Sequence, residues 1–397
     1  MKKFMVTIGS FIIMLFLGLI YAWSIFGKAL KEEGWKGDSS LAFTISIAAF
    51  CLGGLVTSQI KRKVNLTIIL LCDALLILAG FVLSSFTGDN YLLLYISYGC
   101  LAGFAVGSAY NIIISIVPLH YPKKISGTVG GAMLLGFGFG GLLLGIAAKK
   151  LISSFGVFET FLYIGIAFFI VFLMFMFFIK PPVNSDSDSD SDNNYITATD
   201  SNSKNYTISQ MIKHPYFWAF FVWQTLVDSL GLSLIGQATF IADEAKIGIA
   251  FIALTAGIAS ICSGFGKMLF GFLYDFKGRS FTLALTAICG FISAILTIVS
   301  IVYHLPVLFF VAIIIGGLAY GSGPGCNAAF TRKQFGDEHF SGNFAVNTLA
   351  LLVAAFAGSY MTGLLQGATN TYLYPLIVLV VYMVIAFIAA LTMKKER

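Results

Sequence analysis

The chain has 397 residues, of which 58% are hydrophobic and only 11% are charged. Soluble globular domains carry about 25% charged residues, so this composition excludes an ordinary soluble protein. The formal charge of +6 does not indicate a nucleic-acid partner, because the basic residues are scattered between apolar runs and form no cluster. The six cysteines lie inside apolar runs without metal-site or disulfide spacing, and we expect no metal and no cofactor.

Twelve apolar runs are long enough to cross a bilayer as helices, which takes about 20 residues each. Their continuity favours helices over the alternating strands of a barrel. The first run resembles a signal peptide but is too long for one, so it is the first membrane helix. The sequence predicts an all-α membrane protein with twelve transmembrane helices at residues 4–27, 40–60, 65–87, 91–116, 126–148, 157–180, 215–242, 247–273, 280–303, 305–330, 342–365 and 371–393.

Lysine and arginine are divided unevenly between the two sides of the predicted bundle. With the N-terminus inside, seventeen fall in cytoplasmic segments and six on the opposite side, and Lys267 completes the total of 24. Because positive charge is retained inside, both termini are predicted to be cytoplasmic. A multi-pass protein of the plasma membrane is favoured, and an organelle membrane stays open because the sequence shows no organelle address.

A polar segment divides the twelve spans into six and six. It contains four consecutive Ser-Asp pairs, from Ser185 to Asp192, and cannot bury an apolar core. Such composition is typical of a disordered tether, with phosphorylation of its serines as the alternative. The predicted organisation is a first six-helix bundle at 1–180, an acidic cytoplasmic linker at 181–208 and a second six-helix bundle at 209–397.

The two halves also repeat in sequence. Gly103 and Gly107 match Gly317 and Gly321 at an offset of 214, and Ser126-Gly127 matches Ser341-Gly342 at 215. A third match aligns Gly54–Ser58 with Gly271–Asp275 at 217. Small residues at such spacing are common in membrane helices, but three matches at nearly one offset indicate a duplication. Two parallel six-helix repeats predict two pseudo-symmetric bundles with a site between them.

Lys267 is the charge that this organisation has to accommodate. It lies eight residues before Asp275, where its apolar run ends. At about 1.5 Å per residue this depth is about 12 Å, near the middle of an apolar slab about 30 Å thick. A lysine there costs roughly 2.5–3.5 kcal/mol and normally faces a bundle interior, where it attracts anions. The alternatives are a purely structural ion pair and a side chain that extends to the membrane surface.

Two acidic residues are also predicted to lie deep in the membrane. Asp228 is thirteen residues past Pro215, and Asp73 is nine residues past Val64. Neither can be ionised and unpaired there, so each is protonated or partnered. Asp228 is the candidate counter-charge of Lys267, either in a pair that proton or substrate binding breaks or in a static pair. For Asp73 a protonated carboxyl that bonds to a neighbouring helix is favoured over a role in proton coupling.

Over nearly its whole length the sequence resembles the major facilitator superfamily. Gly271-xxx-Asp275-xx-Gly278-Arg279 is similar to its cytoplasmic loop motif, which the resemblance implies acts as a conformational switch. The motif Gly18-Leu-Ile-Tyr21-Ala-Trp23, the run from Tyr98 to Tyr110 and the segment His120-Tyr-Pro-Lys-Lys124 are similar to the oxalate/formate antiporter and monocarboxylate transporter group. In that group a cation stands four residues before the motif glycine, at the position of Lys267. The antiporters of that group carry a second cation in helix 11, and the matching position here is Leu351. With one cation in place of two, the resemblance implies a substrate with a single negative charge.

The remaining candidate site residues are polar or aromatic groups on predicted spans. Aromatic rings fit small organic acids by shape, and amides orient carboxylate oxygens. Together with Lys267, the predicted substrate-binding set contains Tyr21, Trp23, Tyr110, Asn111, Tyr320, Asn327 and Asn347. The glycine-rich run from Gly136 to Gly141 is mid-helix with no strand before it, so close helix packing explains it better than a nucleotide loop.

Three functions compete. The first is a secondary transporter of small carboxylates, driven by proton symport or anion exchange and active as a monomer in membrane lipid. The second is a transporter of the same fold for another metabolite, such as an amino acid or a vitamin, and the third is a membrane sensor without transport. An enzyme is disfavoured, because the four histidines lie at span edges and no nucleophile–base pair is visible. The retained Lys267 and Asp228 favour the carboxylate transporter.

Overall fold

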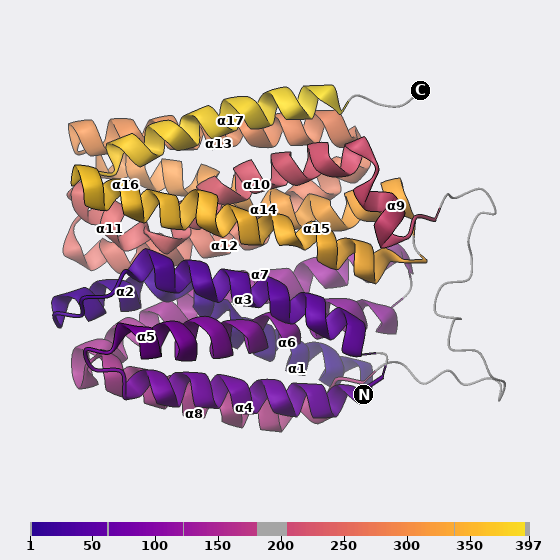
Figure 1. Ribbon diagram of the computed structural model, residues 1–397, viewed down its shortest axis with the longest axis horizontal. Helices are drawn as coiled ribbons and strands as arrows, with labels where there is room; N and C mark the ends of the chain where they lie inside the picture. Colours follow the sequence, from indigo (N-terminus) through magenta and orange to yellow (C-terminus); the bar gives the residue numbers. More distant parts are fainter. Residues whose placement is uncertain (1, 62, 122, 181–204, 337, 394–397) are drawn as a thin grey trace.

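The computed structural model describes residues 2–61, 63–121, 123–180, 205–336 and 338–393 (Figure 1). These residues form helices joined by turns and loops, with no strand among them. Twelve helical spans within them are long and apolar enough to cross a membrane, as predicted. The twelve-helix, all-α fold class is therefore confirmed.

The first six spans form the lower half of Figure 1. Two of them change helix type: the first passes through the 3-10 turn η1, and the fourth contains the π-helical segment η2. A Cβ on Gly18, where η1 begins, would collide with the Phe137 carbonyl, so the first span crosses the fifth in backbone contact. The elements are α1 (Lys2–Leu17), η1 (Gly18–Ala22), α2 (Trp23–Glu32), α3 (Ser39–Ile60), α4 (Leu66–Ser85), α5 (Tyr91–Leu94), η2 (Tyr95–Ala102), α6 (Gly103–Ile116), η3 (Val117–His120), α7 (Lys123–Phe155), α8 (Val157–Phe175) and η4 (Met176–Phe178).

The last six spans form the upper half of Figure 1. Gln237 separates α10 from α11 within the seventh span, and a π-helical segment, η5, interrupts the eleventh. Ser359 in η5 and Gly236 at the end of α10 pack against each other at these two breaks. The elements are α9 (Ile208–Ile212), α10 (Pro215–Gly236), α11 (Ala238–Glu244), α12 (Ile249–Lys277), α13 (Arg279–Tyr303), α14 (Pro306–Phe335), α15 (Phe340–Ala355), η5 (Phe356–Tyr360), α16 (Met361–Thr369) and α17 (Leu373–Thr392).

The sequence repeat is a repeat of helix contacts. In each half, glycines let two spans pack backbone to backbone, which small residues allow in membrane helices. A Cβ on Gly53 would collide with the Phe104 carbonyl, and one on Gly266 with the Leu318 carbonyl. Gly107 lies against Phe50 in the first half, as Gly321 lies against Ser263 in the second.

These contacts set the register between the second and eighth spans. Gly53 and Gly266 differ by 213 residues, as do the first residues of α4 and α13, Leu66 and Arg279. The predicted offset of 217 for these spans is therefore wrong by four residues, which is one helical turn. At the offset of 213 the first-half counterpart of Lys267 is Gly54.

The two halves meet along two crossings, α7 with α12 and α3 with α15. At the first, Ser260 donates a hydrogen bond of 2.9 Å to the Gly138 carbonyl, and a Cβ on Gly141 would collide with the Ser260 side chain. Gly136 and Gly140 face α1 instead. The glycine run in α7 thus packs against one helix on each side, as the sequence predicted.

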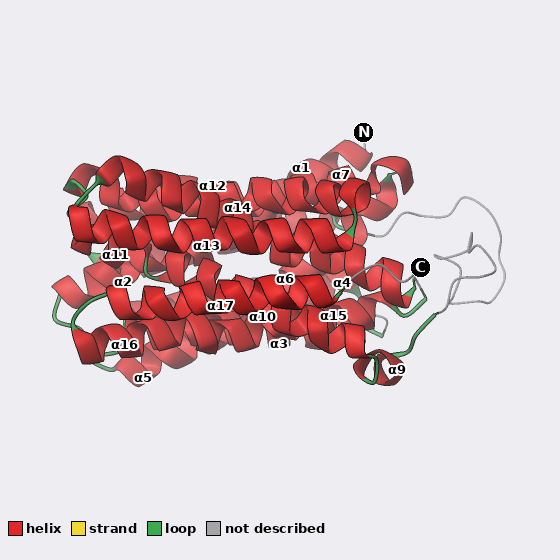
Figure 2. Ribbon diagram, turned by 90° about the horizontal axis from the view of Figure 1, so that it is seen from above, coloured by secondary structure: helices red, strands yellow, loops and turns green. Residues whose placement is uncertain are grey.

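The ends of the bundle differ. We call the end that holds Lys2, the two edges of the linker and Thr392 the linker end, and the opposite one the far end (Figures 1 and 2). At the far end, contacts between α2 and α11 join the two halves. Lys28 forms a salt bridge of 3.1 Å with Asp243, and Thr239 donates a hydrogen bond of 2.8 Å to the Ser24 carbonyl. These contacts close the far end between the halves.

The second half is also braced at its far end. Glu244 accepts hydrogen bonds from the Thr371 hydroxyl and, at 2.9 Å, from the Tyr372 amide. Burial raises the pKa of Tyr372, so its hydroxyl stays protonated and donates to Gln237 at 3.1 Å. The break between helices α10 and α11 at Gln237 is therefore held in place by the loop before α17.

Of the predicted linker, residues 181–204 lie outside the described residues, and Asn205 to Ile208 lie within them. The Tyr206 amide donates to the Phe335 carbonyl at 2.9 Å, and its carbonyl accepts from Asn343 at 2.8 Å. A capping box of Thr207 and Gln210 then starts α9. The chain is therefore fixed to the second half from Tyr206 onward.

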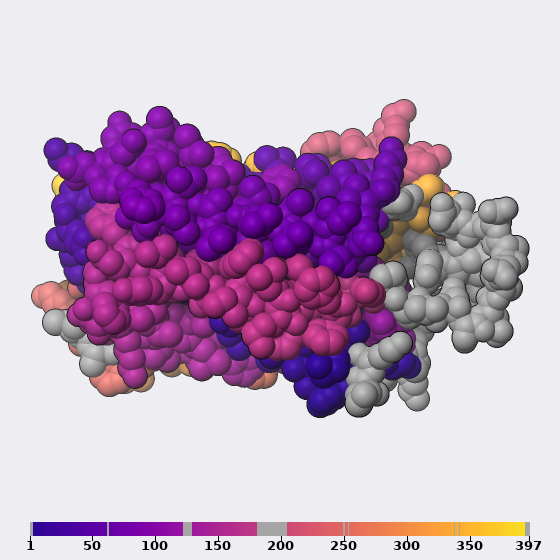
Figure 3. Space-filling model, turned by 90° about the horizontal axis from the view of Figure 1, so that it is seen from below, coloured from indigo at the N-terminus to yellow at the C-terminus, as the bar shows by residue number. Residues whose placement is uncertain are grey.

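The outer surface is apolar. Figure 3 shows the face formed by the first half, where α4 and α8 lie side by side. Large apolar side chains are exposed on both helices, including Leu75 at 49%, Ile170 at 50% and Met174 at 59%. Soluble proteins rarely expose such continuous apolar surface, whereas the acyl chains of a bilayer cover it without cost.

Candidate functional site

Lys267 lies in the interior of the molecule with 4% of its surface exposed. Its Nζ is 5.5 Å from the ring centroid of Tyr21 and 5.2 Å from that of Phe137, both in the first half. Across the described part of the chain, no carboxylate oxygen comes within 4.0 Å of this Nζ. Its ammonium is therefore held between the halves by two aromatic rings, in contacts typically worth about 0.5–2 kcal/mol each.

The backbone around Lys267 is fixed by α14. Gly321 lies against the Lys267 amide, and Gly325 lies against its Cα and carbonyl. A side chain at either glycine would separate α12 from α14 at this level. The backbone contact with α14 leaves the Lys267 side chain to extend away from α14, and its contacts with Tyr21 and Phe137 show that it extends toward the first half.

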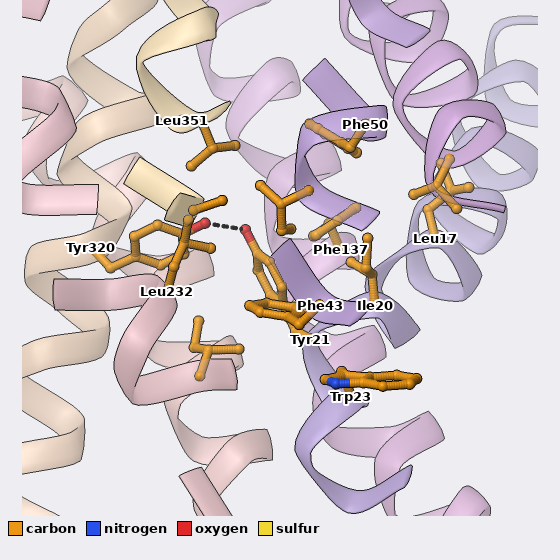
Figure 4. Close-up of a cluster of buried hydrophobic side chains, with 14 of the residues drawn as sticks. Leu17, Ile20, Tyr21, Trp23, Phe43, Phe50, Phe137, Leu232, Tyr320 and Leu351 are labelled. Carbon is orange, nitrogen blue, oxygen red and sulfur yellow. Dashed lines mark hydrogen bonds between the residues drawn. The ribbon is translucent and has the colours of Figure 1, made fainter. Parts of the chain in front are cut away.

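A pair of tyrosines joins the halves beside this cation. The hydroxyls of Tyr21 on η1 and Tyr320 on α14 form a hydrogen bond of 2.8 Å (Figure 4). The Tyr320 ring rests on Gly231 of α10, where a Cβ would collide with it. Leu351, the position of the second cation in the resembling group, lies next to the pair in Figure 4.

Asp228 lies on α10 and is completely buried. Its Oδ2 accepts a hydrogen bond of 3.2 Å from Gln224 Nε2, and its Oδ1 has no partner among the described residues. The carboxylate packs against Gly323 of α14, at which a Cβ would collide with Oδ1. Tyr320 packs against Gly231, three residues further along α10, and bonds to Tyr21, whose ring contacts Lys267, so all four groups lie in one region.

Asp228 and Lys267 are thus not in direct contact. Their side-chain oxygen and nitrogen atoms are farther apart than the 4.0 Å limit of a salt bridge, and the carboxyl bonds only to Gln224 among the described residues. A third group, Ser263, lies one turn before Lys267, and its buried Oγ also has no partner in the described structure. Several polar atoms with spare bonding capacity therefore converge on this region.

Tyr110 joins this region, and Trp23 does not. The Tyr110 ring lies 5.1 Å from that of Phe50 and 5.4 Å from that of Phe137, the ring that contacts the Lys267 ammonium. Trp23 instead donates to the Ser39 carbonyl at 2.7 Å and stacks on Tyr98 at 4.3 Å, inside the first half. Figure 4 shows it pointing away from the tyrosine pair.

The three predicted amides lie nearer the linker end. Asn327 and Asn347 share Thr331: its hydroxyl donates to Asn327 at 3.0 Å and accepts from Asn347 at 3.2 Å. Asn327 follows Tyr320 by two helical turns, about 10 Å along α14. Asn111, on α6, bonds to Ser115, which also accepts from Lys61 at 2.9 Å. These hydrogen bonds join the amides to neighbouring polar side chains, and none of the three amides is bonded to the Lys267 ammonium.

Asp73 is buried within the first half. Its Oδ2 accepts a hydrogen bond of 2.8 Å from Ser108, whose hydroxyl also bonds to Thr57 at 2.6 Å. The three residues come from α4, α6 and α3, so they connect neighbouring spans of one bundle. Asp73 is therefore apart from Lys267 and Asp228.

The loop motif ties the linker end of the second half together. Gly271 faces the Gly325 carbonyl, Asp275 forms a salt bridge of 2.6 Å with Lys333, and Gly278 separates α12 from α13 with φ of 86°. Arg279 donates to Gln334 at 2.9 Å and to the Met393 carbonyl at 3.1 Å. These contacts stay within the second half.

Reasoning from the sequence missed Phe137, Phe50 and Gln224. Gln224 carries a usable signal, because it precedes Asp228 by four residues and so shares its helix face. The two phenylalanines carry none, since the chain contains 39 of them. In the described ranges, no group of three or more His, Cys, Asp or Glu residues is arranged to hold a metal ion.

Comparisons with known proteins place this arrangement in a family. Residues 3–235 match the family model of the Major Facilitator Superfamily, which is more than half of the chain. The chain is 24% identical to the Uncharacterized MFS-type transporter YhjX of Escherichia coli (strain K12), over 69% of this chain and 66% of that protein. It is 23% identical to the Oxalate:formate antiporter of Oxalobacter formigenes, over 90% of this chain and 83% of that one. A third relative, the Cis,cis-muconate transport protein of Acinetobacter baylyi, is 25% identical over 69% of this chain and 63% of its own length.

Solved structures agree on the fold. The xylose transporter XylE from E. coli, in a partially occluded inward open conformation, superposes with a TM-score of 0.73 at 12% identity, over the full length of both chains. A point mutant of the nucleoside transporter NupG superposes with a TM-score of 0.71 at 14% identity, again over both full chains. Two six-helix halves with a buried polar centre between them, together with the match over residues 3–235, show that the chain belongs to the major facilitator superfamily.

Proposed function

We propose that this protein is a secondary transporter of small organic anions, with a monocarboxylate as substrate and Lys267 as its anion-binding group. The observation that carries the proposal is the environment of the Lys267 ammonium. It is buried between the halves, and no acidic side chain of the described structure neutralises it by direct contact. A carboxylate that enters this low-dielectric region supplies the missing partner.

The relatives support an anionic substrate. Two of them are named for the transport of carboxylates, oxalate and formate in one case and cis,cis-muconate in the other. One cation beside Leu351 favours a monoanion over a dianion, because a second carboxylate would be buried without a cation of its own. Proton symport and anion exchange both remain compatible with Asp228 near the cation.

The arrangement of the ends supports alternating access. We assign the linker end to the cytoplasm, since it collects most of the Lys and Arg residues. The far end is closed by α2 and α11, and the crossings of α7 with α12 and α3 with α15 are the surfaces on which the halves rock. Tyr21 and Tyr320 separate during this motion, because their hydrogen bond joins the two halves.

The test is uptake of labelled monocarboxylates by purified protein in liposomes. Lys267→Ala is expected to lower uptake at least a hundredfold, which corresponds to about 2.7 kcal/mol for the loss of a charged partner. The control is Lys36→Ala, which removes an exposed lysine from the loop before α3 and is expected to leave uptake unchanged. Undiminished uptake in Lys267→Ala would contradict the proposal.

Two outcomes favour the alternatives. Uptake of neutral metabolites with no response to carboxylates indicates a transporter of the same fold for another substrate. Binding of a carboxylate without uptake indicates a sensor. An inward proton gradient separates the coupling modes: it raises uptake in a symporter and has no effect on an exchanger.

A further inference from the structure

Two buried acceptor atoms near Lys267 have no hydrogen-bond donor. They are Gln224 Oε1 and Asp228 Oδ1, on side chains that are 1% and 0% exposed. The other ends of these side chains are joined, because Gln224 Nε2 donates to Asp228 Oδ2 at 3.2 Å. This bond uses the amide nitrogen and turns the amide oxygen away from the carboxylate.

An unpaired buried acceptor is expensive. Each has lost its hydrogen bonds to water without a replacement, so natural structures leave few of them without a reason. Gln224 and Asp228 are four residues apart on α10, which puts both acceptors on the same helix face. The nearest cation does not satisfy them, since no salt bridge joins Lys267 to Asp228. With the amide in this orientation, a proton on Asp228 Oδ1 would still leave Gln224 Oε1 unpaired.

The packing holds these acceptors in the region of the proposed anion site. Gly323 receives the Asp228 carboxylate, and Gly231 supports the ring of Tyr320. That tyrosine bonds to Tyr21 of the first half, whose ring contacts the Lys267 ammonium. Acceptors on α10 and the cation on α12 therefore border the same interior region.

We propose that Gln224 and Asp228 form an acceptor subsite beside Lys267, and that the substrate is a small carboxylate which also carries a hydrogen-bond donor. The donor is a hydroxyl or an ammonium near the carboxylate, as in a 2-hydroxy acid or a 2-amino acid. This inference rests on the proposed function, because it assigns the carboxylate to Lys267. A 2-amino acid keeps that carboxylate but is a zwitterion, so uptake of the amino acid alone would replace the monoanion of the proposed function.

A simple carboxylate fits the region poorly. Acetate offers only acceptor oxygens and a methyl group, so it leaves both acceptors of α10 unpaired and adds negative charge near Asp228. Sites that are built to bond a polar substrate group discriminate strongly against the analogue without it, because their own buried groups then stay unpaired. The preference for the donor-bearing acid should therefore exceed about tenfold, the equivalent of one hydrogen bond of about 1.4 kcal/mol.

The experiment compares matched substrates in liposomes: glycolate with acetate, lactate with propionate, and alanine with propionate. Wild-type protein is expected to take up glycolate and lactate, or alanine, at least tenfold more efficiently than the matched simple acid. The hydroxy and amino arms identify which donor is bound. Equal efficiency for both members of every pair overturns the inference.

Gln224→Met tests the subsite directly, since it keeps the length of the side chain and removes the acceptor. We expect it to reduce the preference about tenfold, while Gln59→Met, at an exposed position on α3, leaves the preference unchanged. An unchanged preference in folded Gln224→Met contradicts the inference. If that variant does not fold, thermal stabilisation of the wild type decides: glycolate or alanine should raise its melting temperature more than acetate or propionate does.

Failure of the proposed function gives a different result. In that case no carboxylate of either kind is taken up, and Lys267→Ala changes nothing. If simple acids are transported as well as donor-bearing ones and Lys267→Ala abolishes both, the anion site stands and the acceptor subsite does not.

Discussion

Lys267 is balanced by aromatic rings, and this has a consequence for how an anion binds. The contacts with Tyr21 and Phe137 stabilise the ammonium by a few kcal/mol at most, and they remain in place when a carboxylate approaches. A direct ion pair with Asp228 would have to be broken first, at a cost that removal of buried partners puts at about 3–5 kcal/mol. The gap between the two charges therefore makes the cation available.

Gly323 allows a prediction about the opposite charge. Gly323→Ala places a Cβ against the Asp228 carboxylate. The carboxylate should then shift from its position, because Asp228 is completely buried and cannot keep both its place and the new methyl group. We expect uptake to fall at least tenfold, while the stability of the protein falls by no more than about 3 kcal/mol. Uptake in liposomes and thermal unfolding in detergent measure the two effects.

A matched substitution is available for comparison. Gly367, on α16, has open space where a Cβ would stand, with no atom within 4 Å, so Gly367→Ala should leave uptake unchanged and stabilise the helix slightly. Equal loss of uptake in both variants would show that the effect at Gly323 is a general one on the fold. It would then not concern Asp228.

At the scale of elements, α2 and α11 hold the far end closed. Asp243→Lys turns the salt bridge with Lys28 into a repulsion between the halves. Both side chains are partly exposed, so the change is modest, about 1 kcal/mol, and should shift the balance toward a state open at the far end about fivefold. Spin labels at Lys36 and Lys246, both exposed at this end, measure the separation of the halves in a cysteine-free background.

The exchanged pair supplies the control for this prediction. Lys28→Asp combined with Asp243→Lys restores attraction and should restore the wild-type distances. Glu32→Lys makes the same charge change at an exposed site on α2 and is expected to have little effect. Distances that do not respond to Asp243→Lys would mean that the salt bridge has no part in closing the far end.

The elements also show what a sequence can reveal. Span number follows from apolar runs, because a bilayer requires about 20 consecutive apolar residues. Span limits follow less closely: the fifth span, predicted at 126–148, extends to Phe155, and the seventh, predicted at 215–242, breaks after Gly236. The breaks at η1, Gln237 and η5 do not follow, since they depend on which helix packs alongside. The same holds for rotation about a helix axis: Tyr21 and Trp23 are two residues apart on the first span, and only contacts with α14 and η2 decide that one faces the other half and one does not.

For the candidate site, the depth of the charged residues in the membrane could be predicted from the sequence, and the residues that they contact could not. Charged residues in an apolar run mark Lys267 and Asp228 as interior groups whatever the fold. Their separation depends on the spacing of α10, α12 and α14, which glycines such as Gly321 and Gly323 set through contacts that a single sequence does not show. The one-turn error in the register of the repeat has the same origin.

At the scale of the whole molecule, the linker has to span the two halves without restraining them. Replacement of Ser185–Asp192 by eight alternating glycines and serines keeps its length and removes its charge. If the segment is a tether, uptake should stay within about twofold of wild type, since a linker of unchanged length keeps its reach. A larger change would indicate that its acidic residues regulate transport.

The repeat is nearly symmetric in its packing and asymmetric in its charge. Gly54 stands in the first half where Lys267 stands in the second; Gly107 and Gly321 pack alongside in matching positions, whereas Asn111 replaces Gly325. The proposed substrate-binding residues Lys267, Asp228 and Gln224 all belong to the second half. A bound substrate therefore stays with the second half, and the first half moves relative to it. Substrate choice and turnover are then separable for protein engineering: substitutions in α10 and α12 should alter what is transported, and substitutions on the first-half side, at Phe50, Tyr110 or Phe137, should alter how fast.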